Sequence, residues 1–114
     1  MLNSERHNLE TCIAACQEAI LACQNCAVQD FRAGTALCAL ISLDCADMCA
    51  VTMNSMARGS IHHGDFCAIC AHLCRACATT CAPHAEIHEH CARCMAACEK
   101  CANECAKHSK ERHM

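Results

Sequence analysis

The cysteines of this chain recur at intervals of three and four residues, which is the spacing of one face of an α-helix. The clearest stretch runs from Cys91 to Cys105, CARCMAACEKCANEC, with the pattern C-x2-C-x3-C-x2-C-x3-C. The same pattern recurs 24 residues earlier, from Cys67 to Cys81, as CAICAHLCRACATTC. Two stretches with identical spacing indicate two helices whose inner faces carry thiols where aliphatic side chains normally lie.

The remaining cysteines extend this pattern to two further helices. In the N-terminal part, Leu9, Ala19 and four cysteines follow one another at steps of three or four residues. This pattern lapses around Gln29 to Gly34, and Gly59 and Pro83 mark two further turns. We therefore predict an all-α fold, a single-domain antiparallel four-helix bundle with a cysteine-lined core over residues 1–114. The predicted helices span about residues 4–27, 34–57, 61–82 and 84–108.

Composition excludes several other classes of protein. The chain has 114 residues with 17 Cys, 2 Phe and no Trp or Tyr, so an aromatic-filled core is excluded. The formal net charge is −3, with acidic and basic residues interspersed, and predicts neither nucleic-acid binding nor a polybasic membrane patch. The first residues, MLNSERHNLE, are charged where a signal peptide is apolar, and charge-free runs such as residues 33–43 are too short to span a bilayer. We expect a cytoplasmic protein with no nucleic-acid or membrane partner.

The spacing of the cysteines favours metal bridges over disulfides. The cytosol keeps thiols reduced, and an odd number of cysteines leaves at least one unpaired. Residues three or four apart on a helix have Cβ atoms about 5–6 Å apart, whereas a disulfide needs about 3.5–4.5 Å. Two metal–sulfur bonds of about 2.3 Å span about 4.6 Å. Neighbouring thiols on one helix can therefore share a metal ion without distorting the helix.

Free cysteine also packs as a small hydrophobic residue, so any one of these cysteines alone would be read as part of the core. Seventeen in register leave little aliphatic volume and make an oxidation-prone core, which favours metal binding over packing alone. The predicted metal ligands include every cysteine of the chain: Cys12, Cys16, Cys23, Cys26, Cys38, Cys45, Cys49, Cys67, Cys70, Cys74, Cys77, Cys81, Cys91, Cys94, Cys98, Cys101 and Cys105.

The continuous stripes favour monovalent copper. Structural zinc sites and iron–sulfur clusters use discrete sets of four ligands, into which these stripes do not divide naturally. Each zinc ion with four thiolates also carries a net charge of about −2, which accumulates in a dry core. Cu(I) is soft, accepts two or three bridging thiolates, and is electrically neutral with one thiolate per ion. We expect several Cu(I) ions per chain, on the order of one per cysteine.

The chain resembles the bacterial cytosolic copper storage proteins, which are cysteine-rich four-helix bundles. The resemblance lies in CADMC at Cys45 to Cys49, in the two cysteine stripes, and in the H-x3-H-x-H-C run from His84 to Cys91. It covers nearly the whole chain and implies Cu(I) stored along the bundle core, an entrance that bears histidines, and homo-tetramers. Ala19 and either Ile41 or Ser42 interrupt the stripes and leave the exact capacity open.

Three histidines precede the last cysteine stripe and are candidate ligands at an entrance. His84 and His88 are four residues apart on the predicted inner face, one turn before Cys91, and His90 adjoins that cysteine. Imidazole binds Cu(I) less tightly than thiolate, so it suits transfer of an ion. The alternative is that these histidines only cap and solvate the start of a helix. His63 and His108 fall at the opposite end, where a second, minor site stays open.

A thiol oxidoreductase, a zinc-buffering protein and a copper chaperone are the alternatives to a copper storage protein. A thiol oxidoreductase places its C-x2-C pair at a helix N-terminus beside a sheet, and no strand pattern occurs here, so we do not expect an enzyme. A zinc or general soft-metal buffering protein is the main alternative, and metal stoichiometry separates the two. A dedicated chaperone needs two exposed cysteines and not buried stripes. The expected partners are copper ions or a copper chaperone, and further copies of the chain.

Overall fold

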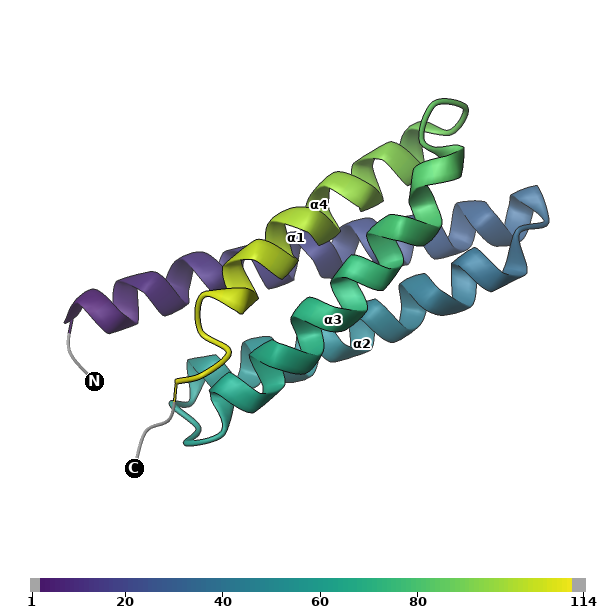
Figure 1. Cartoon of the computed structure of the whole chain (residues 1–114). Helices are drawn as coiled ribbons and strands as arrows, with labels where there is room; N and C mark the ends of the chain where they lie inside the picture. The colour runs from purple at the N-terminus through teal and green to yellow at the C-terminus, as the bar shows by residue number, and fades with distance from the viewer. Residues whose placement is uncertain (1–2, 112–114) are drawn as a thin grey trace.

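The computed structural model describes residues 3–111, with side chains from residue 9 onward, and contains four long helices that run up and down one bundle (Figure 1). The bundle measures 46 × 19 × 18 Å. The described residues form helices and turns with no strand, which confirms the predicted all-α fold. The elements are α1 (Asn3–Ala33), α2 (Ala36–Ala57), α3 (His63–Cys81), the 3-10 turn η1 (Ala82–His84) and α4 (Glu89–Ala106).

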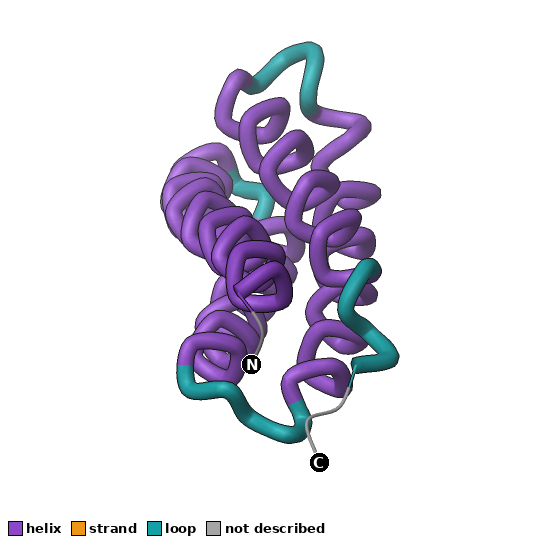
Figure 2. The backbone as a smooth tube through the Cα atoms, turned by 90° about the vertical axis from the view of Figure 1, so that its left-hand side faces the viewer, coloured by secondary structure: helices purple, strands orange, loops and turns teal. Residues whose placement is uncertain are grey.

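Each helix packs against two neighbours. The backbones of α1 and α2, α2 and α3, α3 and α4, and α4 and α1 lie side by side, whereas no Cα atoms of the diagonal pairs of described helices come within 8 Å. Figure 2 shows the helices with their connecting turns at the two ends of the bundle. Because the backbones of the diagonal pairs stay apart, side chains from all four helices fill the space along the bundle axis, and Cys45 of α2 reaches across it to lie 3.8 Å from Cys98 of α4.

The first helix is longer than the sequence predicted. It was expected to end near residue 27, yet α1 continues to Ala33 and ends only where Gly34 adopts a φ of 82°. The polar residues that interrupt the stripe near Gln29 do not break a helix, because hydrophobic pattern and helix propensity are separate properties. Gly34 can adopt this left-handed conformation without steric cost. The next helix therefore begins at Ala36 and not at residue 34.

The connection between α3 and α4 also differs from the prediction. The third helix occupies His63–Cys81, slightly shorter than the predicted 61–82. The fourth helix was expected to start at residue 84, but it starts at Glu89. Pro83 lies in the 3-10 turn η1, and His88 has an extended backbone with φ −118° and ψ 116°. An extended residue cannot continue a helix, so the residues between η1 and α4 form a turn. The fourth helix also ends at Ala106, two residues before the predicted end.

Cysteine and alanine make up nearly all of the core. All 17 cysteines are buried, and the buried hydrophobic set otherwise consists of alanines with Leu9 and Met56. Alanine favours the helix and adds little bulk, so it lets neighbouring helices approach closely. Several larger apolar residues, such as Leu37 and Ile87, are instead exposed. The interior is therefore lined by sulfur along most of its length.

Two stretches in the described part of the chain, Ala36–Ala57 and His63–His84, are long and apolar enough to cross a membrane by composition alone. Their mean hydropathy is 1.7 and 1.2, and 39% of each window is buried within the bundle. The cysteines and alanines that face the core contribute to this apolarity, and in α2 exposed residues such as Leu37 and Leu40 add to it. A core helix of a soluble bundle meets the same criterion for this reason.

Candidate metal centre

The sulfur atoms of all four helices meet along the bundle axis. Between neighbouring helices, the shortest distance is 3.4 Å, from Cys45 Sγ to Cys74 Sγ. Cys23 Sγ lies 3.5 Å from Cys98 Sγ, and Cys49 Sγ lies 3.6 Å from Cys74 Sγ. Within one helix the sulfurs of Cys101 and Cys105 lie 4.0 Å apart. The thiols thus form one connected row along the bundle axis, here called the thiol file, and not isolated pairs.

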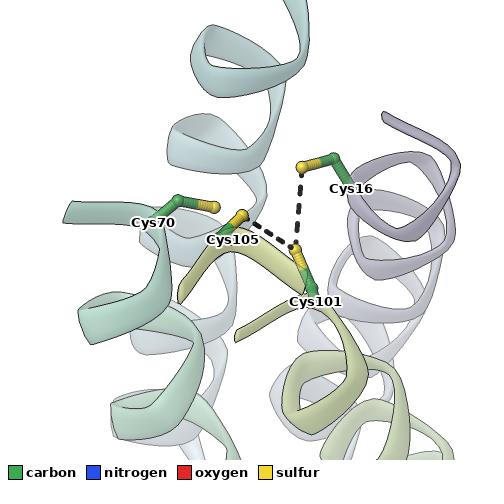
Figure 3. A group of neighbouring side chains, drawn as sticks. All are labelled: Cys16, Cys70, Cys101 and Cys105. Atoms are coloured by element: carbon green, nitrogen blue, oxygen red, sulfur yellow. Dashed lines mark hydrogen bonds between the residues drawn. The ribbon is translucent and has the colours of Figure 1, made fainter. Parts of the chain in front are cut away.

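These sulfurs form groups in which every Sγ lies within 4.8 Å of every other. Several thiols belong to more than one group, as Cys105 does at one end of the file. Figure 3 shows the group that contains Cys101 and Cys105, to which α1 contributes Cys16 and α3 contributes Cys70. The thiol groups include Cys16, Cys70, Cys101 and Cys105; Cys23, Cys45, Cys77 and Cys98; Cys49, Cys70, Cys74 and Cys101; and Cys12, Cys67 and Cys105.

The observed spacing fits metal ions held between thiolates. Three thiolates around one ion, each at a metal–sulfur distance of about 2.3 Å, lie about 4.0 Å apart. The sulfur–sulfur contacts of 3.4–4.0 Å come close to that value. A disulfide instead requires about 2.05 Å, and all 17 cysteines are free thiols. Because the groups share members, a thiol here is placed to bridge two ions, as soft thiolates do.

Two positions interrupt the file, as the sequence indicated. Ser42 and not Ile41 is the inner residue of α2, since Ser42 is fully buried and Ile41 packs at the edge of the core. The Ser42 hydroxyl lies 3.7 Å from Cys77 Sγ. Ala19 is fully buried on α1. At these two points the file loses one thiol each, because neither hydroxyl nor methyl is a soft ligand.

The thiol file ends next to a carboxylate and an imidazole at one end of the bundle, which the α1–α2 turn and the start of α4 form. Asp30 is buried on α1, and its Oδ1 lies 3.0 Å from His90 Nε2. The thiol of Cys26 donates to Asp30 Oδ2 at 3.4 Å, and that of Cys91 donates to Oδ1 at 3.7 Å. Asp30, His90, Cys26 and Cys91 form a group with the spacing of metal ligands.

The contact with Asp30 determines which nitrogen of His90 is available. A carboxylate only accepts hydrogen bonds, so His90 Nε2 carries the proton and the lone pair of the neutral ring lies on Nδ1. Carboxylate–histidine pairs orient metal-binding imidazoles in this way. Burial and, after it, the nearby charges of Cys26 and Asp30 together raise the pKa of the Cys91 thiol to about 12. Cys91 is therefore protonated at neutral pH until a metal ion replaces the proton.

The other two predicted histidines lie outside this group. His84 belongs to η1 and His88 precedes α4, so neither occupies the inner face of a helix as predicted, because α4 starts five residues later than expected. The His88 ring stacks on His90 with centroids 5.1 Å apart, and the His84 ring lies 6.5 Å from His88. His88 and His90 line a surface hollow of about 350 Å³ beside Gln29. The three rings thus lead from the surface to the first thiols.

Asp30 is the residue that sequence reasoning missed. The polar stretch around Gln29 was interpreted as a lapse in the pattern, although Asp30 follows Cys26 by four residues and so continues the inner stripe. A carboxylate at a stripe position, one turn after a thiol, was the available signal. A hydrophobic or cysteine pattern does not reveal such a residue, because a carboxylate is neither apolar nor a thiol.

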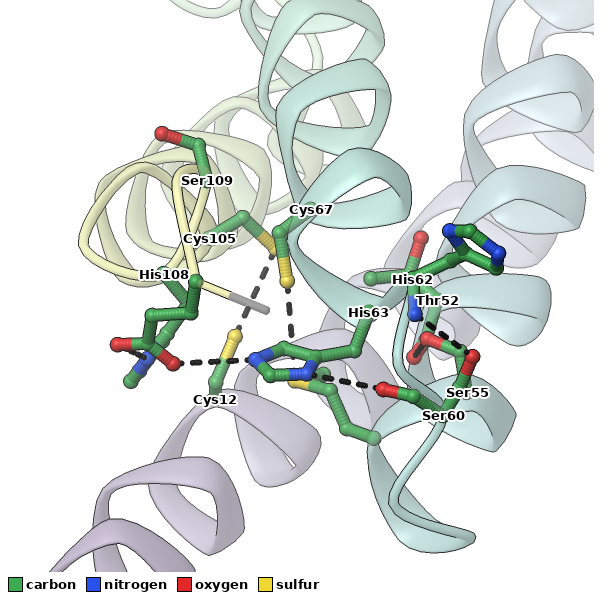
Figure 4. Close-up of polar contacts among 12 residues, drawn as sticks. Cys12, Thr52, Ser55, Ser60, His62, His63, Cys67, Cys105, His108 and Ser109 are labelled. Carbon is green, nitrogen blue, oxygen red and sulfur yellow. Dashed lines mark hydrogen bonds and ion pairs between the residues drawn. The ribbon is translucent and has the colours of Figure 1, made fainter. Parts of the chain in front are cut away.

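At the opposite end the file stops at Cys12, Cys67 and Cys105. Cys12 Sγ lies 3.6 Å from Cys105 Sγ, and Cys67 donates to the thioether sulfur of Met56 at 3.9 Å. His63 is fully buried there (Figure 4). His108 was expected at this end as the last residue of the predicted helix 84–108, and it is buried in the turn that follows α4.

A bundle whose axis is a continuous file of shared thiols defines a class of proteins that hold several soft metal ions. Comparisons with known proteins give the family. The chain belongs to the copper storage protein (Csp) family, whose sequence profile matches residues 4–110. This membership confirms the resemblance inferred from the cysteine stripes and the histidine run.

Individual relatives match over most of their length. An uncharacterized cysteine-rich protein, YhjQ, from Bacillus subtilis (strain 168) is 37% identical over 88 residues, which cover 71% of this chain and 77% of YhjQ. The Cu(I)-bound copper storage protein BsCsp3 is similar in structure, with a TM-score of 0.83, 33% identity, and coverage of 90% of this chain and 98% of that one. A cytosolic copper storage protein from Streptomyces lividans with five coppers has a TM-score of 0.86, 28% identity, and coverage of 98% and 100%.

Proposed function

We propose that this chain stores Cu(I) in the cytosol by binding many ions to the thiolates along its axis. The observation that carries the proposal is the set of overlapping thiol groups contributed by all four helices, with sulfurs 3.4–4.0 Å apart. Shared thiols suit a soft ion of low coordination number. One Cu(I) per thiolate also keeps the dry core electrically neutral. Similar proteins bind Cu(I) and several coppers, which supports this assignment.

The geometry favours storage over catalysis and over delivery of a single ion. A thiol oxidoreductase and a copper chaperone both need an accessible cysteine, because a thiolate must reach another molecule. All 17 cysteines of this chain are buried. Each is surrounded by further thiols or lies at the end of their file, so an ion that enters meets more ligands as it moves inward.

Copper capacity tests the storage proposal directly. We expect reduced protein, titrated with Cu(I) without oxygen and weighed by native mass spectrometry, to bind on the order of 17 ions, one for each of its 17 thiols. A zinc-buffering protein would instead take about four divalent ions, since each closed site uses four thiolates. Saturation at one or two Cu(I) would contradict storage.

A matched variant checks that the ions lie in the core. Replacing Cys23, Cys45, Cys77 and Cys98 with serine removes one complete thiol group and leaves the surface unchanged. The capacity of this variant should fall by about four ions, one per lost thiol. An unchanged capacity would place the copper elsewhere.

We propose that the ions enter at the end that carries the histidines. His88 and His90 line the surface hollow there, and Asp30, His90, Cys26 and Cys91 form the first group behind it. The carboxylate attracts a cation, and the free nitrogen of His90 offers a ligand weaker than thiolate. An ion that arrives at this group can pass to the thiols without being trapped. A copper chaperone is the expected donor.

We further propose that the chain assembles into a homo-oligomer, with a tetramer as the expected form. Val28, Phe31, Leu37 and Leu40 flank the α1–α2 turn and are each about half or more exposed. Apolar side chains gathered on a surface commonly mark an interface between proteins. Covering them in an assembly removes their apolar surface from water, which stabilises the complex.

Charged substitutions at that surface test the assembly. The double variant Leu37→Glu with Leu40→Glu should shift the sedimentation equilibrium mass from about four chains toward the single chain of 12.3 kDa, because burying two charges opposes association. Leu21→Glu is the matched control, since Leu21 is equally exposed but lies beside α4. A wild-type protein that sediments as a monomer would contradict the proposal.

A further inference from the structure

Two buried histidines share one carboxylate at the end of the bundle opposite the proposed copper entrance (Figure 4). His63, the first residue of α3, is fully buried, and His108 is nearly so. Glu111 Oε1 lies 3.0 Å from His63 Nε2, and Glu111 Oε2 lies 2.8 Å from His108 Nδ1. Glu111 itself is partly exposed. The proposed storage of copper uses none of these three side chains.

Both ring nitrogens of His63 face hydrogen-bond acceptors. His63 Nδ1 lies 3.2 Å from the carbonyl oxygen of Ser60, which only accepts hydrogen bonds, so Nδ1 carries a proton. A neutral His63 then directs the lone pair of Nε2 at Glu111, which also only accepts. Either a second proton or a metal ion must lie between them. An imidazole that donates one N–H to a backbone carbonyl is the usual arrangement of a metal-binding histidine.

Backbone packing holds the three side chains together. A Cβ atom at Gly64 would overlap the carbonyl oxygen of Glu111 and would lie only 3.0 Å from the His108 carbonyl oxygen. The terminal turn therefore rests directly on the first turn of α3, where no residue larger than glycine fits. The amide of Glu111 also donates to the His108 carbonyl at 3.0 Å. Such a cluster is positioned before any ion arrives, which lowers the entropic cost of binding.

The cluster is accessible from the surface and differs chemically from the thiol file. His108 and Glu111 line a pocket of about 270 Å³ together with Thr11, Glu104 and Lys107. Two imidazoles and a carboxylate suit borderline divalent ions such as Zn²⁺, whereas Cu(I) prefers the thiolates behind them. Ligands about 2.1 Å from a tetrahedral ion lie about 3.4 Å apart. The two imidazole nitrogens contact different oxygens of Glu111, at 3.0 and 2.8 Å, so an ion held by both rings would meet both oxygens of the carboxylate.

We propose that His63, His108 and Glu111 form a second metal site, which binds one borderline divalent cation of the Zn²⁺ class. The ion replaces the proton between His63 Nε2 and the carboxylate and joins α3 to the turn after α4. This site is independent of the copper-storing thiols, so it remains available when they are occupied.

The test uses full-length protein whose thiols are already saturated with Cu(I), and Zn²⁺ as the probe. We expect one Zn²⁺ per chain to remain after desalting, measured by inductively coupled plasma mass spectrometry. Glu111→Gln removes a charged ligand but keeps the size of the side chain, and should weaken Zn²⁺ binding roughly 100-fold, since losing even an outer-shell partner costs 10–100-fold. Glu104→Gln is the matched control in the same pocket and should leave the affinity within about twofold of wild type.

Cobalt reports which atoms bind the ion. Co²⁺ added to the Cu(I)-saturated protein should give weak visible bands without the intense ultraviolet thiolate-to-cobalt charge transfer. Retention of no Zn²⁺, equal retention by wild type and Glu111→Gln, or a thiolate–cobalt band would each overturn the proposal. Copper content should be the same in all variants, so a failure here is distinguishable from a failure of copper storage.

Discussion

Copper loading should raise the melting temperature of this protein by on the order of 20 °C or more, since about 1 kcal/mol shifts a domain of this size by about 4–8 °C. The apo core contains mostly cysteine and alanine, with few large apolar side chains to bury. An ion held by one of the thiol groups would bind thiolates from different helices and would therefore favour the folded state. One site at a free copper concentration of 1,000 times its Kd adds about 4.1 kcal/mol to the free energy of unfolding. Copper binding to the thiols of the unfolded chain reduces this stabilisation.

Circular dichroism at 222 nm during anaerobic heating of apo and loaded protein measures this shift. The apo protein should already be helical at low temperature, because alanine-rich amphipathic helices pack without metal. The variant with serine at positions 23, 45, 77 and 98 should gain less from copper, as it lacks one group of ligands. A disordered apo chain would contradict a preformed bundle, and an unchanged melting temperature would contradict ions that bridge helices.

Removing the side chains at the proposed entrance should slow copper exchange without lowering capacity. His90→Leu deletes the imidazole that contacts Asp30, and Asp30→Asn deletes the charge that attracts the cation. Either change should slow loading, and removal by a chelator, roughly 10-fold or more, the scale expected when a partner of a metal ligand is lost. Final capacity should stay within about one ion of wild type, because all thiols remain.

The structure also ranks the three histidines. His90 contacts Asp30 directly, the His88 ring stacks on His90, and His84 lies one ring further out. Stopped-flow loading should therefore be slowed most by His90→Leu, less by His88→Leu and least by His84→Leu. His62→Leu, a change of an exposed residue at the opposite end, is the control. Rates unaffected by every substitution at this end would place the entrance at His63 and His108.

The sequence by itself determined the helical bundle and the lining of its core. Cysteines at steps of three and four, as in Cys67 to Cys81, fix both the helical period and the inner face. Glycine at 34 and 59 marked two of the turns, and both residues have positive φ. These features are local, because helix period and turn conformation depend on neighbours in the chain.

Only the tertiary structure decided which thiols share a group and where the end sites lie. The packing of α1 against α4 brings Cys23 into contact with Cys98. It also brings Asp30 into contact with His90, although the two residues are 60 positions apart in the sequence. The positions of His84 and His88 depend on the residue at which α4 begins after Pro83. Helix propensity does not specify that boundary to within a few residues. Contacts between distant segments depend on helix register and crossing, which no local pattern of a single chain encodes.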